Sequence, residues 1–293
     1  MSPSRLASIL GLTNSDDNDD KNWLEQAVAT NRRRGFPQRQ KTTSTTSTTS
    51  TLSMSTAAPG PGPAPAPSPV HYYYDLMSQP SRALFIIFRL SGMPFQDCVV
   101  ALRNGEHLTD EYKTNINRFQ RVPCINDNGY KLAESVAILR YLSAKGKIPE
   151  HLYPKYFVDQ ARVDEFLEWQ HMTLRITCAL YFRTVWLEPL LTGRTPKEDK
   201  IEKLRMQMEL NLDVIEDVWL QNSDFVSGST LTAADIFAAC EIEQTRMADY
   251  DVRIKYPKIR AWLKRVRQTC NPHYDVAHEF VYKISGTGPQ AKL

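Results

Sequence analysis

The chain has 293 residues, of which 42% are hydrophobic and 24% are charged, and this is enough apolar material for a normal globular core and for two domains. The formal net charge is +3, and basic residues are interspersed with acidic ones, which argues against a nucleic-acid-binding surface. No stretch approaches the roughly 20 uninterrupted apolar residues that a membrane-spanning helix needs, so we expect no membrane span.

The five cysteines are odd in number and scattered through apolar surroundings. This usage is typical of cytosolic thiols and not of a disulfide framework, so we expect a cytoplasmic protein. Neither the cysteines nor the six histidines show the spacing of metal ligands. We therefore expect no structural metal.

Residues 1–69 are expected to form a disordered, low-complexity tail. They contain Ser/Thr repeats followed by alternating prolines in PGPGPAPAPSP. Such a segment cannot bury enough apolar area to offset about 1 to 2 kcal/mol of backbone ordering entropy per residue. One short helix near residues 23–29 is the regular element predicted there. The acidic cluster at residues 16–20 argues against a transit peptide.

Residues 70–148 are expected to form an α/β domain. A strand at 71–76, a helix that ends at Gly92 and a second strand at 95–102 have the pattern of a β-α-β unit. After a polar stretch, two short strands flank a hairpin turn at Asn128-Gly129, and a last helix begins near Glu134. The order β-α-β-α-β-β-α predicts a compact sheet with helices on both faces.

Residues 155–285 are expected to form an all-helical domain, because strand signals end after Pro154 and helical periodicity takes over. The strongest local signal is STLTAADI, in which Thr232 begins a helix and Asp235 reaches back to the Thr232 amide as a capping box. The predicted helices span residues 157–191, 197–220, 232–247, 257–269 and 274–283.

Ser78 lies where the first strand is followed by a helix, in YYYDLMSQPSRA. The free amides and the dipole of a helix N-terminus favour an anion there, and a thiolate is such an anion. The Ser78 hydroxyl can donate a hydrogen bond to it, and Arg82 can add positive field. The alternative is that Ser78 merely caps the helix.

Two further segments suit an extended peptide ligand. A proline at the head of a strand, as in Val122-Pro123, either marks an edge or takes the cis form, which turns the Val122 N–H and C=O outward. Glu134 and Ser135 open a helix, where amides and a hydroxyl hold a carboxylate and the Glu134 carboxylate accepts from an amino group. The alternatives are an ordinary strand start and a glutamate that complements the helix dipole.

In order along the chain, SQPSRA, RVPCI and LAESVAILRYL, followed by a helical half with STLTAADI, resemble the cytosolic glutathione S-transferases. The segments DLMSQPSRA, GEHLTDE and ARVDEFLEWQHMTLR are most similar to the theta class, in an insect-like form with an N-terminal extension. The resemblance covers about residues 71–285. It implies a thioredoxin-like first domain and an all-α second domain, with glutathione in the cleft between them.

The resemblance also implies roles for particular residues. Ser78 matches the theta-class serine that touches the glutathione sulfur, and Arg175 matches an arginine that helps to stabilise the thiolate. The other matches are Val122 and Pro123 for the cysteinyl part, Glu134 and Ser135 for the γ-glutamyl end, and His107 and Leu108 near the glycyl end. One departure is Arg118, which follows Asn117 where the family commonly has proline and predicts a less rigid loop.

The implied function is conjugation of the glutathione thiolate to small electrophiles such as halides, with reduction of organic peroxides as a further reaction. Glutathione is then a co-substrate, no cofactor is expected, and Phe182 and Trp186 are candidates for the wall of an apolar pocket. The resemblance implies a homodimer. Tyr72, Tyr73 and Tyr74 are weaker rivals of Ser78. Two other hypotheses are a non-catalytic binding or docking protein of the same fold, and a tail that recognises partners.

Overall fold

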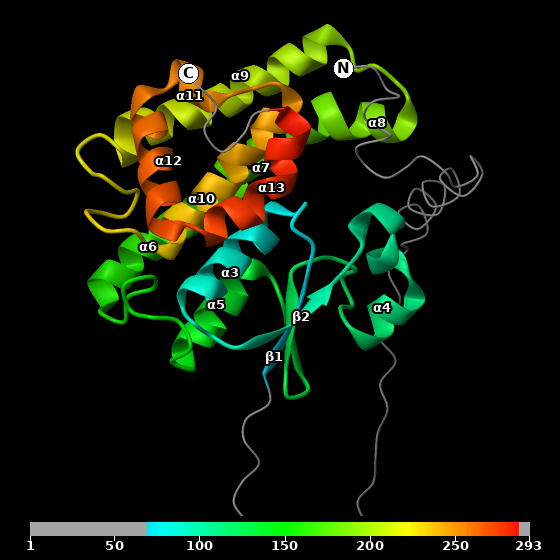
Figure 1. Cartoon of the computed structure of the whole chain (residues 1–293). Coiled ribbons are helices and arrows are strands. Elements are labelled where there is room, and N and C mark those ends of the chain that lie inside the picture. The colour runs from blue at the N-terminus through cyan, green and yellow to red at the C-terminus, as the bar shows by residue number, and fades with distance from the viewer. Residues whose placement is uncertain (1–68, 287–293) are drawn as a thin grey trace, which may run out of the picture. The chain divides into compact units, whose positions relative to one another are not determined.

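The computed structural model describes residues 69–286 (Figure 1), so the predictions for the tail, including its short helix, lie outside the described residues except for Pro69. The strands are β1 (Val70–Tyr74), β2 (Phe95–Val99), β3 (Cys124–Asp127) and β4 (Tyr130–Ala133). The helices among and after the strands are α3 (Gln79–Leu90), η1 (Leu102–Asn104), η2 (Glu106–Leu108), α4 (Asp110–Asn115) and α5 (Ser135–Ala144). The later helices are α6 (Phe157–Met172), α7 (Leu174–Phe182), η3 (Arg183–Leu187), α8 (Glu188–Thr192), α9 (Glu198–Val214), η4 (Ile215–Trp219), α10 (Ala233–Gln244), η5 (Thr245–Ala248), α11 (Val252–Lys255), α12 (Pro257–Cys270) and α13 (His273–Ser285).

The four strands form one mixed sheet in the order β2-β1-β3-β4. β1 pairs in parallel with β2 and antiparallel with β3, while β3 and β4 form an antiparallel hairpin. Asn128 and Gly129 at the tip of this hairpin both have positive φ, 52° and 92°, as a two-residue type I′ turn requires. The predicted order of strands and helices and the predicted turn are confirmed.

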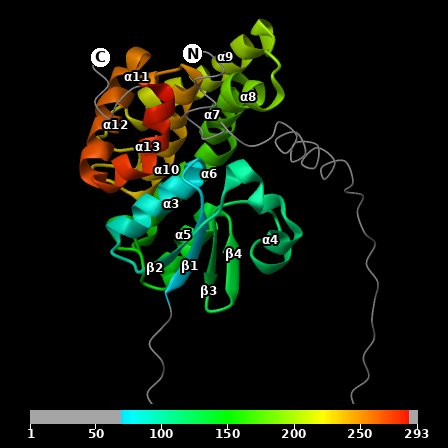
Figure 2. The same cartoon turned by 45° about the vertical axis from the view of Figure 1, so that its right-hand side comes forward.

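The sheet has helices on both faces, as predicted. Figure 2 shows α3 and α5 on one side of the strands and α4 on the other. Tyr72 and Tyr74 of β1 point to the same face because side chains alternate along a strand, and their rings are buried and stacked with centroids 4.7 Å apart. Phe88 of α3 meets the Tyr72 ring edge-on. The first strand and the first helix therefore share one apolar layer.

The first helix of the helical half is interrupted, which differs from the single helix predicted over 157–191. α6 ends and α7 begins around Thr173, whose backbone leaves the helical region at φ −118° and ψ −88°. The Thr173 hydroxyl donates to the Trp169 carbonyl four residues earlier, and such back-bonding bends helices. The apolar periodicity continues across this point, so the pattern carries no sign of the break.

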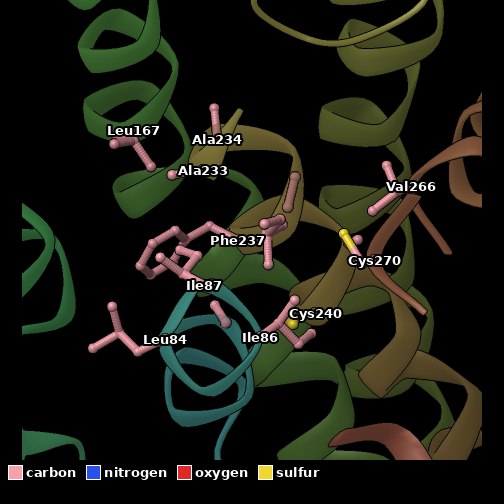
Figure 3. Packing of buried hydrophobic residues seen from close by; sticks show 14 of the residues in the cluster. Leu84, Ile86, Ile87, Leu167, Ala233, Ala234, Phe237, Cys240, Val266 and Cys270 are labelled. Atoms are coloured by element: carbon pink, nitrogen blue, oxygen red, sulfur yellow. The ribbon is translucent and has the colours of Figure 1, made fainter. Parts of the chain in front are cut away.

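α10 forms the centre of the helical half, and every one of its residues is buried. Figure 3 shows Ile87 of α3 close to Phe237 of α10, with Ala233 and Ala234 above them. The predicted capping box is present, since the Thr232 amide donates to Asp235 Oδ2 at 2.9 Å. Asp235 Oδ1 also accepts from Trp262 Nε1 of α12 at 2.8 Å. The α/β half is joined to the helical half through this contact between α3 and α10.

Candidate active site

Ser78 stands at the junction predicted for it, immediately before the first turn of α3. Its backbone is extended, with φ −84° and ψ 123°, and its side chain makes no capping hydrogen bond. The Ser78 amide donates to the Asp75 carbonyl, and its own carbonyl accepts from the Arg82 amide, both at 3.0 Å. Within residues 69–286 the half-buried hydroxyl has no partner. The reading of Ser78 as a side-chain cap is therefore wrong, and its hydroxyl is available to a ligand.

Arg82 is not a lining residue of the candidate pocket, and the positive field that it was expected to add at Ser78 stays a prediction. Arg82 is fully buried. Its Nη1 donates to the Leu76 carbonyl at 2.9 Å, and its Nη2 donates to the Cys240 carbonyl of α10 at 3.0 Å. Burial lowers the pKa of this guanidinium. Arg82 therefore fastens the loop before Ser78 to the helical half.

The Val122-Pro123 peptide bond is cis, which decides between the two possibilities that the sequence left open. Val122 precedes β3, and within the described residues its N–H and C=O make no hydrogen bond. The preceding loop is held by Asn117, whose Nδ2 donates to the Arg121 carbonyl at 2.7 Å and whose Oδ1 accepts from the Phe119 amide at 3.0 Å. The free Val122 peptide groups are suited to pairing with an extended ligand.

Glu134 and Ser135 occupy the start of α5 as predicted. Glu134 is the N-cap residue and has φ 70° and ψ 113°, a backbone conformation that costs a non-glycine residue of order 1 to 3 kcal/mol. Its side chain is exposed and makes no capping bond, whereas Ser135 is buried. The Glu134 carboxylate makes no hydrogen bond to the helix, which leaves its oxygens available to a ligand, and both this role and the complement to the helix dipole stay predictions.

A pocket of about 40 Å³ lies where these segments meet. About 10 to 15 Å³ of such space is enough to hold a water molecule, so the pocket admits a small polar group, such as the end of a peptide. Its lining residues are Pro80 of α3, Val122 and Pro123, Glu134 and Ser135 of α5, Arg175 of α7, and also Asn117, Phe119, Arg121 and Ala133. The fold thus brings together the cis-proline segment, the start of α5 and Arg175, which the sequence singled out separately.

Arg175 is the cationic group that the helical half contributes to this pocket. Its Nε lies 3.5 Å from Glu241 Oε1, and about a quarter (27%) of its side chain is accessible. Within the described residues its Nη atoms make no hydrogen bond. A guanidinium with free donors at a pocket is well suited to bind an anion.

Glu241 of α10 is the carboxylate that Arg175 faces, and it is buried. Its Oε2 has no hydrogen-bond partner among the described residues. Burial raises the pKa of this carboxyl to about 7, although the positive charges of Arg175 and Arg82 act to lower it. The candidate site therefore contains a carboxyl group that titrates near neutral pH.

The chain matches two family models, the glutathione S-transferase N-terminal domain at residues 68–144 and the glutathione S-transferase C-terminal domain at residues 171–269. Glutathione S-transferase theta-1 of Rattus norvegicus is 37% identical over 221 residues, which make up 74% of this chain and 90% of the relative. The chain belongs to the theta class of the glutathione S-transferases. The human theta-1 enzyme is 34% identical over 221 residues, with the same coverage of 74% and 90%.

Solved theta-class structures have the same fold as this transferase. Human glutathione S-transferase T1-1 in its apo form superimposes with a TM-score of 0.71 at 33% identity, covering 76% of this chain and 93% of the human one. Human theta-2 in complex with glutathione gives a TM-score of 0.70 at 33% identity, covering 76% and 90%. The predicted thioredoxin-like and all-α architecture is confirmed, the chain is a transferase, and nothing in these comparisons supports the non-catalytic alternative.

His107 and Leu108 of this transferase lie in η2, outside the 40 Å³ pocket. The Leu108 carbonyl accepts from Gln120 Nε2 at 2.7 Å, which ties η2 to the loop before Val122. His107 is half-buried, and its Nδ1 has no hydrogen-bond partner within residues 69–286. Burial lowers the pKa of His107, with Asp75 and Glu106 opposing this, so its ring is neutral at physiological pH.

Phe182 and Trp186 pack against each other, with ring centroids 5.3 Å apart and planes 21° from parallel. Phe182 is buried in a small cluster that also contains Met247, Val281 and Ile284. Phe182 is therefore a core residue of the helical half, whereas Trp186 lies at the edge of this cluster and is half-buried.

Two residues that shape the site escaped the sequence analysis. Glu241 lies within a helix whose residues are all buried, and the sequence gives no signal that sets its carboxylate apart from other charges. Gln120 has a positive φ of 55° and its side chain donates a hydrogen bond to the Leu108 carbonyl of η2, yet in the sequence it looks like an ordinary polar loop residue.

Among residues 69–286 no helix is both long and apolar enough to cross a membrane.

Proposed function

We propose that this transferase activates the thiol of glutathione with Ser78 and Arg175 and directs the thiolate at small electrophiles. The observation that carries the proposal is the free Ser78 hydroxyl at the start of α3. Ser78 lies two residues before Pro80, which lines the pocket together with the cis Val122-Pro123 segment, the start of α5 and Arg175, although Ser78 is not itself a lining residue. The theta-class membership of the chain supports it.

In this proposal glutathione lies along the edge that these segments form. The free Val122 peptide groups pair with its cysteinyl part, as one strand pairs with another. Glu134 and Ser135 hold the amino and carboxylate groups of the γ-glutamyl end, and the small volume of the pocket suits such an end. His107 and Leu108 lie near the glycyl end.

The thiolate is stabilised by hydrogen bonding and charge. Lowering the pKa of a thiol by about two units requires roughly 2.7 kcal/mol of preferential stabilisation of the anion. One hydrogen bond from Ser78 to a charged sulfur contributes about 1.5 to 3 kcal/mol, and the Arg175 guanidinium adds to it. A serine hydroxyl is not acidic near neutral pH, so Ser78 acts as a donor and not as a base.

The electrophiles that we propose are small halides, with organic peroxides as substrates for reduction. A solved human theta-class relative holds the glutathione conjugate of 1-menaphthyl sulfate, which supports an electrophile with an apolar body and a leaving group. We also propose a cytoplasmic homodimer that needs no metal or other cofactor. Its domains would be the glutathione-binding residues 70–148 and the electrophile-binding residues 155–285, preceded by a disordered tail.

The test is the substitution Ser78→Ala in the full chain, with Ser91→Ala as a matched control. Ser91 lies at the opposite end of the same helix and does not line the candidate pocket. Its hydroxyl donates to the Ile87 carbonyl at 2.7 Å. We expect Ser78→Ala to raise the pKa of bound glutathione by one to two units and to reduce conjugation of a small halide about tenfold or more at neutral pH.

Conjugation rates and the pH titration of thiolate absorbance measure both effects. Ser91→Ala should leave both unchanged. Equal turnover of the Ser78→Ala protein and the wild type would remove Ser78 from the chemistry.

A further inference from the structure

The buried carboxyl group of Glu241 interacts with two cations, Arg175 of the candidate pocket and the buried Arg82. Arg175 of α7 places its Nε 3.5 Å from Glu241 Oε1. Arg82 of α3, which holds the loop before Ser78, also attracts the Glu241 carboxylate. The nearby titratable groups that repel it are the thiols of Cys178 and Cys240, and burial raises the pKa of both, so they are neutral. The charged neighbours of Glu241 are therefore the two arginines, and because burial raises its pKa to about 7, its carboxyl is largely ionised only above neutral pH.

The carboxylate occupies this place at a cost to stability. Glu241 is 1% exposed, and its Oε2 finds no hydrogen-bond partner within residues 69–286. Burying a charged group with one oxygen unpaired is unfavourable, and an apolar side chain of similar volume usually packs as well or better. Packing alone therefore does not account for a glutamate at this position of α10.

The geometry of the pair assigns a role to the carboxylate. Glu241 Oε1 lies 3.5 Å from Nε, Arg175 lines the pocket, and its Nη donors have no hydrogen-bond partner in the described part of the chain, so they are left for a ligand. An arginine is long and loses considerable rotamer freedom when it is fixed. A buried and immobile acceptor fixes it before the ligand arrives, and donors fixed in advance need no reorganisation when charge develops on the sulfur.

We propose that Glu241 is a positioning residue for thiolate formation, and that it acts by holding the Arg175 guanidinium with its Nη edge toward the bound glutathione. The inference rests on the proposed function, in which Arg175 helps to stabilise the thiolate. Glu241 does not touch the substrate and acts through Arg175. Its negative charge also partly offsets the field of Arg175, so position and charge have opposite effects on the sulfur.

These opposite effects make two substitutions informative in the full chain. Glu241→Ala releases Arg175, so we expect the pKa of bound glutathione to rise by about one unit and kcat/KM below that pKa to fall about tenfold. Glu241→Gln keeps an acceptor oxygen for Nε and removes the counter-charge, so we expect the pKa of the bound thiol to fall below the wild-type value. The measurements are the pH titration of thiolate absorbance, and kcat and KM for glutathione.

The matched control is Glu243→Gln, two residues farther along α10. Glu243 is also buried, but it pairs with Arg246 at 2.7 Å and accepts from the Tyr274 hydroxyl at 3.1 Å. Its loss should lower the melting temperature and leave the pKa of bound glutathione unchanged. A general destabilisation of α10 would thus lower the melting temperature of all three variants. Opposite shifts of the thiol pKa are expected only for the two Glu241 variants.

A double-mutant cycle tests whether Glu241 acts through Arg175. In an Arg175→Met background, Glu241→Ala should no longer raise the thiol pKa, because the rise depends on releasing Arg175 and residues that act as a unit are not additive. Additive shifts, or an unchanged thiol pKa in both Glu241 variants, would overturn the inference. If Glu241→Ala does not fold, an unchanged thiol pKa in Glu241→Gln overturns it by itself.

Ser78→Ala, measured in parallel, separates this inference from the proposed function. A thiol pKa that does not respond to Ser78→Ala contradicts the role of Ser78, whatever Glu241 does. A thiol pKa that responds to Ser78→Ala but to neither Glu241 variant contradicts the inference alone.

Discussion

The Ser78 hydroxyl is free because other groups hold the turn in which it lies. The Asp75 carboxylate accepts from the Met77 amide at 2.8 Å and from the Leu102 amide at 3.1 Å. The Arg82 guanidinium donates hydrogen bonds to the Leu76 and Met77 carbonyls of the same turn. A side chain without a structural bond at a helix N-terminus keeps its donor for a ligand.

The hydroxyl groups of two neighbouring tyrosines, Tyr72 and Tyr74, have no such freedom. The Tyr72 hydroxyl donates to the Ser81 carbonyl at 2.7 Å, and the Tyr74 hydroxyl donates to Asp97 Oδ1 at 2.8 Å. Both rings are buried, and this burial is the main reason why the pKa of each hydroxyl is raised. Their donors are engaged in the structure, which favours Ser78 over either of them as the donor to sulfur.

Arg82 provides a prediction at this scale. Arg82→Met removes the donors for the Leu76 and Cys240 carbonyls, and each buried group left unpaired costs about 1 to 3 kcal/mol. We expect the free energy of unfolding to fall by about 3 to 5 kcal/mol. Conjugation per folded molecule should also fall, because the loop before Ser78 is no longer fixed.

Arg89→Met on the same helix is the control. Arg89 pairs with Asp97 at 3.2 Å on the surface, and such exposed pairs contribute about 1 kcal/mol or less. Urea unfolding measures both variants. A loss of stability in Arg82→Met no larger than that in Arg89→Met would show that the bonds of Arg82 are dispensable.

At the scale of elements, α10 determines how the two halves meet. Its residues Phe237 and Cys240 lie beside α3, and its capping box fixes where it begins. Asp235 accepts from the amides of Thr232 and Val226 and from Trp262 Nε1, at distances from 2.8 to 2.9 Å. One carboxylate therefore joins the start of α10, the loop before it and α12.

Asp235→Ala tests this arrangement. It leaves two buried amides and an indole N–H without their acceptor, so we expect a loss of about 3 to 5 kcal/mol in the free energy of unfolding. Asp199→Ala, at the exposed first turn of α9, should change it by less than about 0.5 kcal/mol. Thermal and urea unfolding measure both, and comparable small losses would contradict the role given to Asp235.

At the scale of the whole molecule, a buried polar network connects α10 with the last helix. His278 of α13 is fully buried, and its Nδ1 lies 2.8 Å from the Tyr274 carbonyl. Burial lowers the pKa of His278 to about 3, Arg82 and Arg246 lower it further, and Glu243 acts to raise it. The ring is therefore neutral in the folded protein at neutral pH.

This shift predicts how stability depends on pH. In the unfolded state His278 binds a proton as the pH falls below about 6.5, whereas in the folded state it does so only at about pH 3. The contribution of His278 to stability is therefore fully present above about pH 6.5 and is lost as the pH falls from there to about 3. The expected contribution is a loss of up to about 1.4 kcal/mol per pH unit. The difference in unfolding free energy between the wild type and His278→Phe should change with this slope, whereas His171→Gln, an exposed site, should show no such change. A difference that is flat with pH would contradict the prediction.

The sequence by itself determined the order of strands and helices, the hairpin at Asn128-Gly129 and the capping box at Thr232. These features depend on residues within a few positions of each other, where propensity, turn geometry and local hydrogen bonds decide. It also marked most of the candidate site, because Ser78, Val122-Pro123 and Glu134-Ser135 lie at the ends of such elements.

The tertiary structure decided what these residues face. The packing of α3 and α7 against α10 determines three placements. Arg82 points into the helical half, Arg175 reaches the pocket that Ser135 also lines, and Glu241 lies next to Arg175. The bend at Thr173 belongs to the same group of findings. Contacts between residues far apart in the chain follow from how helices pack, and no local pattern records which charge in a helix will meet another across such an interface.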